Sequence, residues 1–183
     1  MITIVSGLPR SGTSMMMQML IAGGLPACTD FVRRPDVDNP LGYYEHEKVK
    51  RLKQDDAWFD EAEGRALKVV SGLLRELPQD RCYKVIFMQR RLDDVLASQA
   101  RMLQRMGRAE DSPADAEMRE YMELHLAGIT AWLRGRPNME IRYCDYHAML
   151  AAPRDGALAI VRFLGLPLDV ARMASAVRPE LHR

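Results

Sequence analysis

Short apolar runs alternate along the chain with longer stretches in which apolar and polar residues mix. Residues 2–6 are β-branched and apolar and end at Gly7, which is typical of a buried strand. Similar runs predict strands over residues 66–70, 83–88 and 139–143. Strands separated by helical stretches are the pattern of a parallel sheet with helices on its faces. We therefore expect an α/β fold with three layers, in which helices flank a central parallel sheet.

Between these runs, apolar residues recur at the spacing of amphipathic helices. Gly23 stops the first predicted helix, and Asp145 is placed to cap a short later one. Residues 107–116 are polar and contain Pro and Gly, which predicts a loop. The predicted helices cover residues 13–22, 45–54, 92–106, 114–134, 146–150 and 153–165, with a helical turn at 73–77.

Composition narrows the class of protein. A chain of 183 residues suits one domain, which we expect to span 1–183, and 48% hydrophobic with 28% charged residues is a globular composition. The formal net charge is +1, so we expect no nucleic-acid partner, and any anion site must be local. The apolar segment 15–25 is too short to span a membrane, and the N-terminus lacks the features of a signal peptide. These features predict a cytoplasmic protein.

The three cysteines, Cys28, Cys82 and Cys144, are scattered and have no metal-ligand spacing. We interpret them as buried thiols in a reducing compartment and predict no metal site.

The most informative segment follows the first predicted strand, where residues 7–14 have the sequence GLPRSGTS. Gly7 and Gly12 allow the backbone to turn so that successive N–H groups face one point, and the helix that follows adds partial positive charge. Arg10 adds a cation, and Thr13 and Ser14 add hydroxyl donors. A plain strand-to-helix turn with a cap is the alternative. So many anion-binding groups in one turn favour a site for phosphate or another tetrahedral anion in a P-loop-like fold.

The two glycines have the spacing of the nucleotide-triphosphatase loop, G-x-x-x-x-G-K-[ST]. Thr13 stands where that loop has its lysine, and the strand at 83–88 ends in Gln89 and Arg90 rather than in a metal-binding aspartate. Loss of the lysine normally removes ATP or GTP chemistry. A small-molecule kinase of the phosphate-loop class therefore remains an alternative rather than the favoured function.

Residues 9–14, PRSGTS, closely resemble the 5′-phosphosulfate loop of sulfotransferases that use 3′-phosphoadenosine 5′-phosphosulfate (PAPS). The resemblance implies that the backbone amides of Ser11, Gly12, Thr13 and Ser14 hold the 5′-phosphosulfate. It also implies that Arg10 stabilises the bridging oxygen during transfer.

A second segment supports the first. Residues 85–98, VIFMQRRLDDVLAS, look like the family's 3′-phosphate segment, with a serine eight positions after an arginine. The resemblance implies that Arg90 and Ser98 bind that phosphate; the alternative is that Arg90 and Arg91 form a solvated basic pair. A softer match over 142–167 resembles the family's C-terminal strand and helix. The glycine- and basic-rich C-terminal loop of many members has no counterpart here, and Arg178, His182 or Arg183 are candidates to replace it.

Taken together, the resemblance implies a metal-independent sulfotransferase that moves a sulfuryl group from PAPS to a hydroxyl or amine. The acceptor class stays open among small molecules, sugars, lipids and peptides. A non-catalytic nucleotide-binding module is the alternative from another class.

Three side chains are candidates for the remaining chemistry. Residues 39–45, NPLGYYE, look like a segment that opens a helix beside the acceptor in bacterial members, which favours Glu45 as the base. The alternative is that Glu45 only occupies the first turn of its helix, where negative charge is favourable; His46 is the alternative base. Lys68 resembles an active-site lysine at a strand end, or is a surface lysine of an edge strand. We expect the loops at 28–44 and 104–116 to contact the acceptor.

Overall fold

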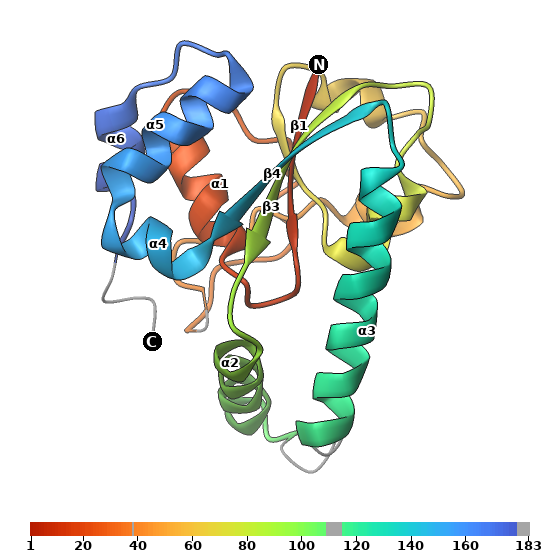
Figure 1. The fold of residues 1–183 in the computed structure, drawn as a ribbon, viewed down its shortest axis with the longest axis vertical. Coiled ribbons are helices and arrows are strands. Elements are labelled where there is room, and N and C mark those ends of the chain that lie inside the picture. The colour runs from red at the N-terminus through yellow and green to blue at the C-terminus, as the bar shows by residue number, and fades with distance from the viewer. Residues whose placement is uncertain (38, 109–114, 179–183) are drawn as a thin grey trace.

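The computed structural model describes residues 1–37, 39–108 and 115–178, and its centre is a parallel sheet (Figure 1). The strand order is β2-β1-β3-β4, and all neighbouring strands are parallel. The register places Val5 between Lys68 and Ile86. The strands are β1 (Ile2–Gly7), β2 (Ala66–Lys68), β3 (Tyr83–Gln89) and β4 (Met139–Asp145).

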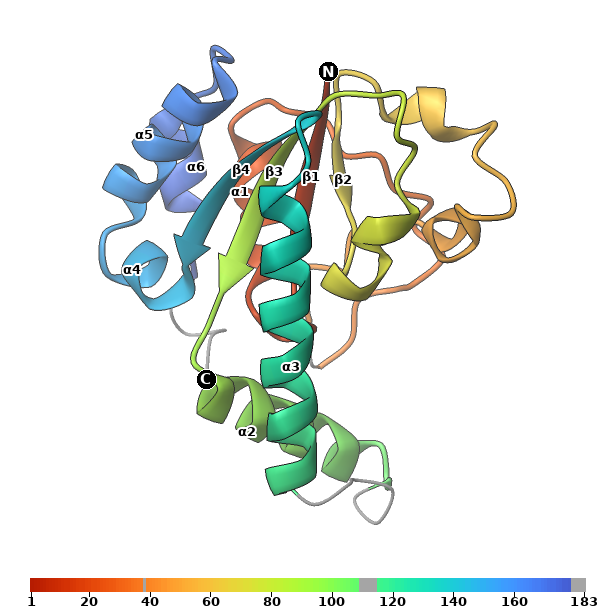
Figure 2. The ribbon, with the colours of Figure 1, turned by 45° about the vertical axis from the view of Figure 1, so that its right-hand side comes forward.

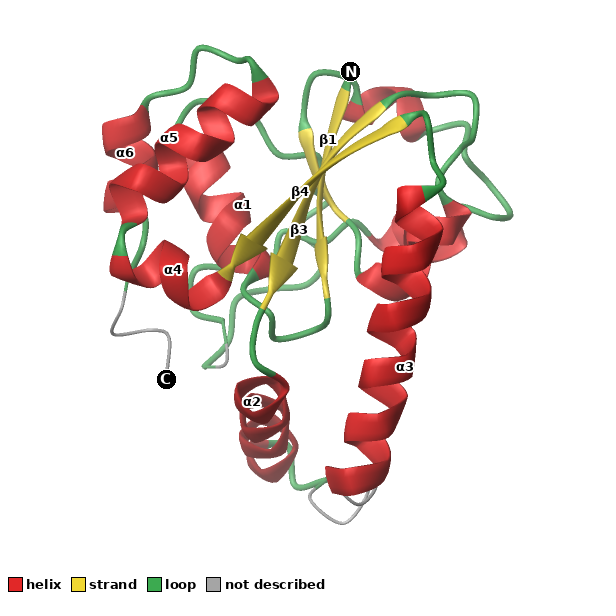
Figure 3. Ribbon diagram, viewed as in Figure 1, coloured by secondary structure: helices red, strands yellow, loops and turns green. Residues whose placement is uncertain are grey.

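Helices cover both faces of this sheet, as Figure 3 shows most clearly. Helices α1, α4, α5 and α6 lie on one face, while α3 and the short 3-10 helices lie on the other; α2 and the lower half of α3 extend beyond the sheet (Figures 1 and 2). The bounds are α1 (Thr13–Ala22), α2 (Leu92–Arg105), α3 (Asp115–Arg134), α4 (Tyr146–Ala151), α5 (Pro153–Leu164), α6 (Val170–Ser175), η1 (Glu47–Arg51), η2 (Phe59–Ala62) and η3 (Ser71–Glu76).

Two cores explain the sequence pattern of the strands. All six residues of β1 are buried, because helices cover both faces, so the strand is apolar throughout instead of alternating. Ile2 and Ile4 pack with η2, η3 and α3, while Val5 packs with α1, α5 and α6. The predicted α/β architecture, a central parallel sheet flanked by helices in three layers, is confirmed.

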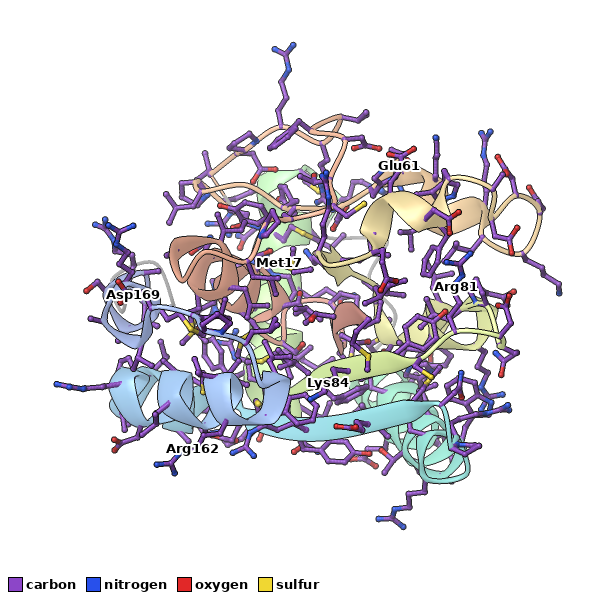
Figure 4. The ribbon with its side chains drawn as sticks, turned by 90° about the horizontal axis from the view of Figure 1, so that it is seen from above. Met17, Glu61, Arg81, Lys84, Arg162 and Asp169 are labelled. Carbon is purple, nitrogen blue, oxygen red and sulfur yellow. The ribbon has the colours of Figure 1, made fainter. Side chains whose placement is uncertain are left out.

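Helix α1 is apolar nearly all round because it is enclosed. Met15, Met16, Met17 and Met19 are buried between the sheet and the helices α5 and α6, and Figure 4 shows Met17 in this layer. Methionine is flexible enough to fill such an irregular space. At the end of the helix, a Cβ on Gly23 would lie 2.5 Å from Met173 Cγ, so this glycine permits the close contact with α6.

Several expected boundaries need correction. The predicted helix over 45–54 is only the 3-10 helix Glu47–Arg51, since His46 occupies its N-cap and its Nδ1 accepts a hydrogen bond from the Lys48 backbone N–H. Strand β2 ends at Lys68 rather than at residue 70. Helices η2 and α6 were not predicted, because both are too short to give a helical period. Most of the loop predicted at 107–116 lies outside the described residues.

The cysteines are free, but they are not all buried. Cys28 and Cys144 lie in the two cores, whereas Cys82 is exposed in the turn before β3, which corrects the prediction of three buried thiols. Within the described part of the chain, none of the helices is long and apolar enough to cross a membrane.

Candidate functional site

Strands β1, β2 and β3 end at the same edge of the sheet, and the loop after β1 is tightly turned there. Gly7, Arg10 and Gly12 have φ angles of 147°, 69° and 98°. The Ser11 backbone N–H and hydroxyl both donate to the Leu8 carbonyl oxygen, at 3.1 and 2.6 Å. The loop is thus fixed from within, in a conformation that glycine supports and that is strained for arginine.

This conformation leaves the start of α1 open to an anion. Gly12 is the N-cap and contributes no side-chain hydrogen bond, and the bond from Met16 N–H to the Gly12 carbonyl oxygen opens the helix. Helix geometry leaves the preceding amides of Thr13, Ser14 and Met15 without intrahelical acceptors. Those amides and the positive end of the helix are suited to bind a tetrahedral anion.

Both glycines of the loop touch the wall behind it. A Cβ on Gly12 would lie 2.5 Å from Cδ2 of Tyr146, and a Cβ on Gly7 would lie 2.6 Å from the Met88 carbonyl oxygen. A side chain at either position would push the loop away from the sheet. The loop backbone therefore lies closer to Met88 and Tyr146 than it could with any other residue at these two positions.

The two sequence motifs meet at Arg10. Arg90, at the end of β3, donates from Nη1 to the Arg10 carbonyl oxygen at 3.0 Å, and its guanidinium lies 4.3 Å from the centre of the Tyr146 ring. Arg10 itself donates from Nε to Oγ of the buried Ser98 at 2.9 Å. Of the basic pair, only Arg91 is a solvated residue; its guanidinium binds Asp94.

Lys68 lies beneath the same loop rather than on the surface, although β2 is an edge strand. The residue is 7% exposed, and its ammonium donates to Tyr43 O at 2.9 Å, Ser14 Oγ at 3.1 Å and Glu45 Oε1 at 3.4 Å. Burial lowers the pKa of Lys68, and the charge of Glu45 opposes that shift. The structure thus places a lysine beside a phosphate-type loop that has none in its own sequence.

Glu45 precedes the helical turn instead of opening it, so it does not serve the first turn of a helix. Its two carboxylate oxygens each accept from Arg33 Nη1 at 3.1 Å, and one of them faces Lys68. Tyr44, the residue before it, has a φ of 54°. Among the described non-glycine residues, only Arg10, Phe31 and Tyr44 have positive φ, and Arg10 and Tyr44 lie in or next to the segments that supply Lys68 with its partners.

His46 is buried against Trp58, with ring centroids 4.3 Å apart and nearly parallel planes. Its Nδ1 accepts from the Lys48 backbone N–H at 3.3 Å and lies 3.6 Å from the Asp30 carboxylate. A neutral ring that accepts at Nδ1 carries its proton on Nε2, where it is a donor. This arrangement suits His46 for packing and for donating a hydrogen bond better than for removing a proton. It therefore favours Glu45 over His46 as the candidate base.

These elements enclose a cavity of about 310 Å³. Four of the sequence candidates, Arg10, Thr13, Glu45 and Lys68, line it together with His46. Ser11 and Arg90 line a neighbouring cavity of about 130 Å³. The other residues around the larger cavity are Pro9, Arg33, Tyr43, Val49, Lys50, Val70, Leu73 and Met102.

Sequence reasoning missed four residues of the site. Asn39 donates from its amide to Ser14 Oγ at 2.8 Å, and Tyr43 lines the cavity; both lie in the NPLGYYE segment, where they could have been found. Arg33 and Tyr146 had no such signal, because their roles come from contacts across the fold. Of the two loops expected to contact the acceptor, 28–44 supplies cavity residues, while much of 104–116, namely residues 109–114, lies outside the described residues. His182 and Arg183, two candidates to replace the C-terminal loop, also lie outside them.

Comparisons with known proteins identify the family and the fold of this chain. A family model described as "Sulfotransferase domain" matches residues 2–179. The sulfotransferase domain of the Synechococcus PCC 7002 olefin synthase superposes with a TM-score of 0.57 at 18% identity, over 93% of this chain and 75% of that one. The sulfotransferase domain from the curacin biosynthetic pathway gives 0.55 at 15% identity, over 97% and 77%. These two likenesses show the fold. No curated protein sequence matches the chain significantly.

Proposed function

Because this chain belongs to the sulfotransferase domain family, we propose that it transfers a sulfuryl group from PAPS to the hydroxyl, or amine, of an acceptor. The observation that carries the proposal is the junction at Arg10. Its carbonyl oxygen accepts from Arg90 and its side chain donates to Ser98, so the loop proposed for the 5′-phosphosulfate adjoins the residues proposed for the 3′-phosphate. One nucleotide would reach both. We propose that the single domain 1–183 carries this activity.

The donor would be held by the start of α1. The amides from Ser11 to Ser14 and the helix dipole suit the 5′-phosphosulfate, and Gly7 and Gly12 let the loop pack closely against Met88 and Tyr146. Arg90 and Ser98 would bind the 3′-phosphate. Arg90 suits this role because its Nε is buried without a hydrogen-bond partner in the described structure, although it makes other contacts through Nη1 and the Tyr146 ring.

The transfer is a displacement at sulfur. The acceptor oxygen forms a bond to sulfur as the bond between sulfur and the bridging phosphate oxygen breaks, which yields a sulfate ester and adenosine 3′,5′-bisphosphate. Arg10 and Lys68 would stabilise negative charge on the departing phosphate. Glu45, which accepts hydrogen bonds from Arg33 and Lys68, would take the acceptor proton and pass it to solvent. The described residues contain no cluster of three metal ligands, and no step is assigned to a metal.

Titration calorimetry distinguishes this function from the kinase. We expect adenosine 3′,5′-bisphosphate to bind more tightly than ATP with magnesium, and Ser98→Ala to weaken that binding. The matched control is Ser175→Ala, whose hydroxyl only contacts its own helix. A preference for ATP with magnesium would overturn the proposal and favour phosphoryl transfer.

Turnover distinguishes the enzyme from a non-catalytic binding module. With PAPS and a mixture of alcohols, phenols, amines and sugars, mass spectrometry should detect a sulfated product. Arg10→Ala and Glu45→Gln should abolish it, whereas Glu47→Gln, which removes an exposed carboxylate two residues away, should not. Tight binding of the bisphosphate without any product would support the module.

The remaining expectations stay proposals. The acceptor is proposed to be a small molecule, sugar, lipid or peptide. The cytoplasm remains the proposed location. The three cysteines are free, which suits a reducing compartment, because oxidising compartments favour disulfides.

A further inference from the structure

The two edges of the sheet differ in what lies beside them. Strand β2, at one edge, has three residues, and segment 26–28 already pairs with it. There the Ala66 N–H donates to the Pro26 carbonyl oxygen and the Cys28 N–H donates to the Ala66 carbonyl oxygen, both at 2.8 Å. Strand β4, at the other edge, has seven residues and pairs only with β3 among the described strands. Seen from above, β4 lies at the outer margin of the sheet (Figure 4).

The backbone of β4 presents polar groups at this margin. The Tyr83 N–H donates to the Asn138 carbonyl oxygen at 2.9 Å, and Tyr83 lies opposite Met139. In a parallel ladder this arrangement turns the peptide groups of the even-numbered residues of β4 toward β3, so that those of Ile141 and Tyr143 point outward. Within the part of the chain that the structure describes, no backbone hydrogen bond forms to these outward groups. They are therefore available to another strand.

Strand β4 also lacks the features that usually keep an edge from pairing, which are shortness, lysine, proline, a bulge or a covering segment. Its sequence, MEIRYCD, has no lysine or proline, and it pairs with β3 over all seven residues without a bulge. A hollow of about 280 Å³ borders its second half, between residues 142–145 and the small residues Ala152, Gly156 and Ala159. Because the side chains of 142–145 point to alternate faces, a hollow that touches all four reaches the edge.

Two copies of the chain can join at this edge only in certain registers. A two-fold axis makes their β4 strands antiparallel, and hydrogen bonds form only where outward groups face outward groups. The register with Ile141 opposite Ile141 of the second copy meets this condition, and it places Glu140 opposite Arg142 of the second copy and Arg142 opposite its Glu140. If the axis moves by one residue along β4, Glu140 faces Glu140 or Arg142 faces Arg142, which is unfavourable.

The side chains on both faces of β4 fit the register centred on Ile141. The Glu140 side chain is 66% exposed and lies 3.6 Å from Lys84, so it is open to a second cation. On the other face, Ile141 would lie opposite Ile141, and the half-exposed Tyr143 would be covered by Met139 of the second copy. Apolar pairs and pairs of opposite charge are the cross-strand contacts that stabilise antiparallel strands.

We propose that the β4 edge is an interface at which a second copy of this chain adds its own β4, antiparallel and centred on Ile141, so that the two sheets become one. Glu140 and Arg142 select the register. The inference does not depend on the proposed function. Because the strands are antiparallel, the two phosphate loops, which follow β1 at the carboxyl end of each parallel sheet, face opposite ends of the joined sheet.

The test is the oligomeric state of the full chain, measured by sedimentation equilibrium over a range of concentrations. We expect a monomer–dimer equilibrium. Arg142→Glu should raise the dissociation constant of the dimer by about tenfold or more, because it converts both ion pairs into pairs of like charge. Glu140→Arg should have the same effect for the same reason.

The double variant that combines Glu140→Arg with Arg142→Glu is the sharpest test, because each pair again has opposite charges. It should recover most of the lost affinity between copies. Lys53→Glu, at an exposed lysine outside β4, makes the same change of charge as Arg142→Glu and should leave the dimer unchanged. Circular dichroism checks that each variant is folded, and bisphosphate affinity should be the same in all of them.

Amide hydrogen exchange followed by NMR locates the interface without any substitution. The amides of Ile141 and Tyr143 should exchange more slowly as the protein concentration increases, because each gains a carbonyl acceptor from the second copy. A chain that stays monomeric at its highest soluble concentration would overturn the proposal. So would a dimer that Arg142→Glu does not weaken or that the double variant does not restore, because another surface or register would then hold it together.

Discussion

Arg90 donates a hydrogen bond to the backbone carbonyl oxygen of Arg10 at 3.0 Å, although 80 positions separate the two residues. The bond connects the end of β3 to the loop after β1, two neighbouring strands of the sheet. It holds Arg10 in its left-handed conformation, in which the side chain reaches Ser98. The two sequence motifs therefore form one structural unit, and the predictions below test the parts of it.

Replacing Gly12 by alanine should damage the loop in two ways. The φ of 98° is unfavourable for alanine by about 1–2 kcal/mol, and contact with the Tyr146 ring adds about 1–3 kcal/mol of overpacking. We expect calorimetry to show bisphosphate affinity reduced by about tenfold or more, which is about 1.4 kcal/mol.

Gly64→Ala is the control for this change. Gly64 also has a positive φ, of 70°, but a Cβ there would have open space. Chemical denaturation should show a smaller loss of stability, with normal bisphosphate affinity. Equal effects of the two variants on affinity would contradict a loop packed tightly against Tyr146.

Lys68 should act as a cation over a narrower pH range than an ordinary lysine. Burial lowers its pKa below the usual 10.5, so the ammonium loses its proton, and with it the stabilising charge, at a lower pH. We expect the alkaline fall in the transfer rate to lie below pH 10.5. Lys68→Met should reduce the rate by about 10²–10³-fold, as removal of a charge-stabilising group does.

Lys53→Met, at an exposed lysine, should leave both the rate and its pH profile unchanged. A rate in Lys68→Met within a factor of about three of the native rate, a difference of only about 0.7 kcal/mol, would show that Arg10 alone serves the departing phosphate.

Tyr146 should support both the loop and Arg90. Its buried ring contacts Gly12 and lies under the Arg90 guanidinium. Tyr146→Ala should lower the free energy of unfolding by about 3–5 kcal/mol, as other large-to-small changes of buried aromatic residues do, and weaken bisphosphate binding. Tyr146→Phe should preserve binding, because it keeps the ring.

Tyr143→Ala is the control. Tyr143 lies on β4, is 37% exposed and makes an edge-to-face contact with Phe87. We expect a smaller loss of stability there and unchanged affinity. If Tyr146→Ala were to bind the bisphosphate as tightly as the native chain, the ring would have no part in shaping the site.

Lys84 should matter for stability alone. From β3 it donates to the carbonyl oxygens of Phe163 and Leu164, at the end of α5, at 2.7 and 3.1 Å. Figure 4 labels Lys84 on its strand. Hydrogen bonds to a charged group contribute about 1.5–3 kcal/mol. Lys84→Met should therefore lower the melting temperature by several degrees, about 2–4 °C per kcal/mol.

Bisphosphate affinity should not change in Lys84→Met, because this contact lies away from the phosphate loop. Lys53→Met should melt like the native chain. A weaker affinity in Lys84→Met with an unchanged melting temperature would mean that α5 influences the site rather than the core.

The sequence was sufficient for features that depend on neighbours in the chain. The apolar run at 2–6 and the methionine-rich stretch after it predicted β1 and α1, because strand and helix periods are local. The glycines of the loop showed where the backbone must turn, since few other residues adopt such angles. The prediction of a helix over 45–54 was wrong in type and length. The charge and length of a segment do not distinguish an α-helix from a short 3-10 helix, such as the one that the buried His46 caps here.

Only the tertiary structure decided which side chains act on the same space. Lys68 could be a surface residue or part of the site, and it is buried because segment 39–45 crosses over β2 and brings Tyr43 and Glu45 to it. Arg33 contacts Glu45 across 12 positions of the chain, and Tyr146 contacts Gly12 across more than 130. Such contacts depend on how the sheet and the loops pack against each other, and the local amino-acid sequence does not specify that packing. The sequence by itself determined the position of the glycine-rich turn between β1 and α1, and the packing determined which side chains surround it.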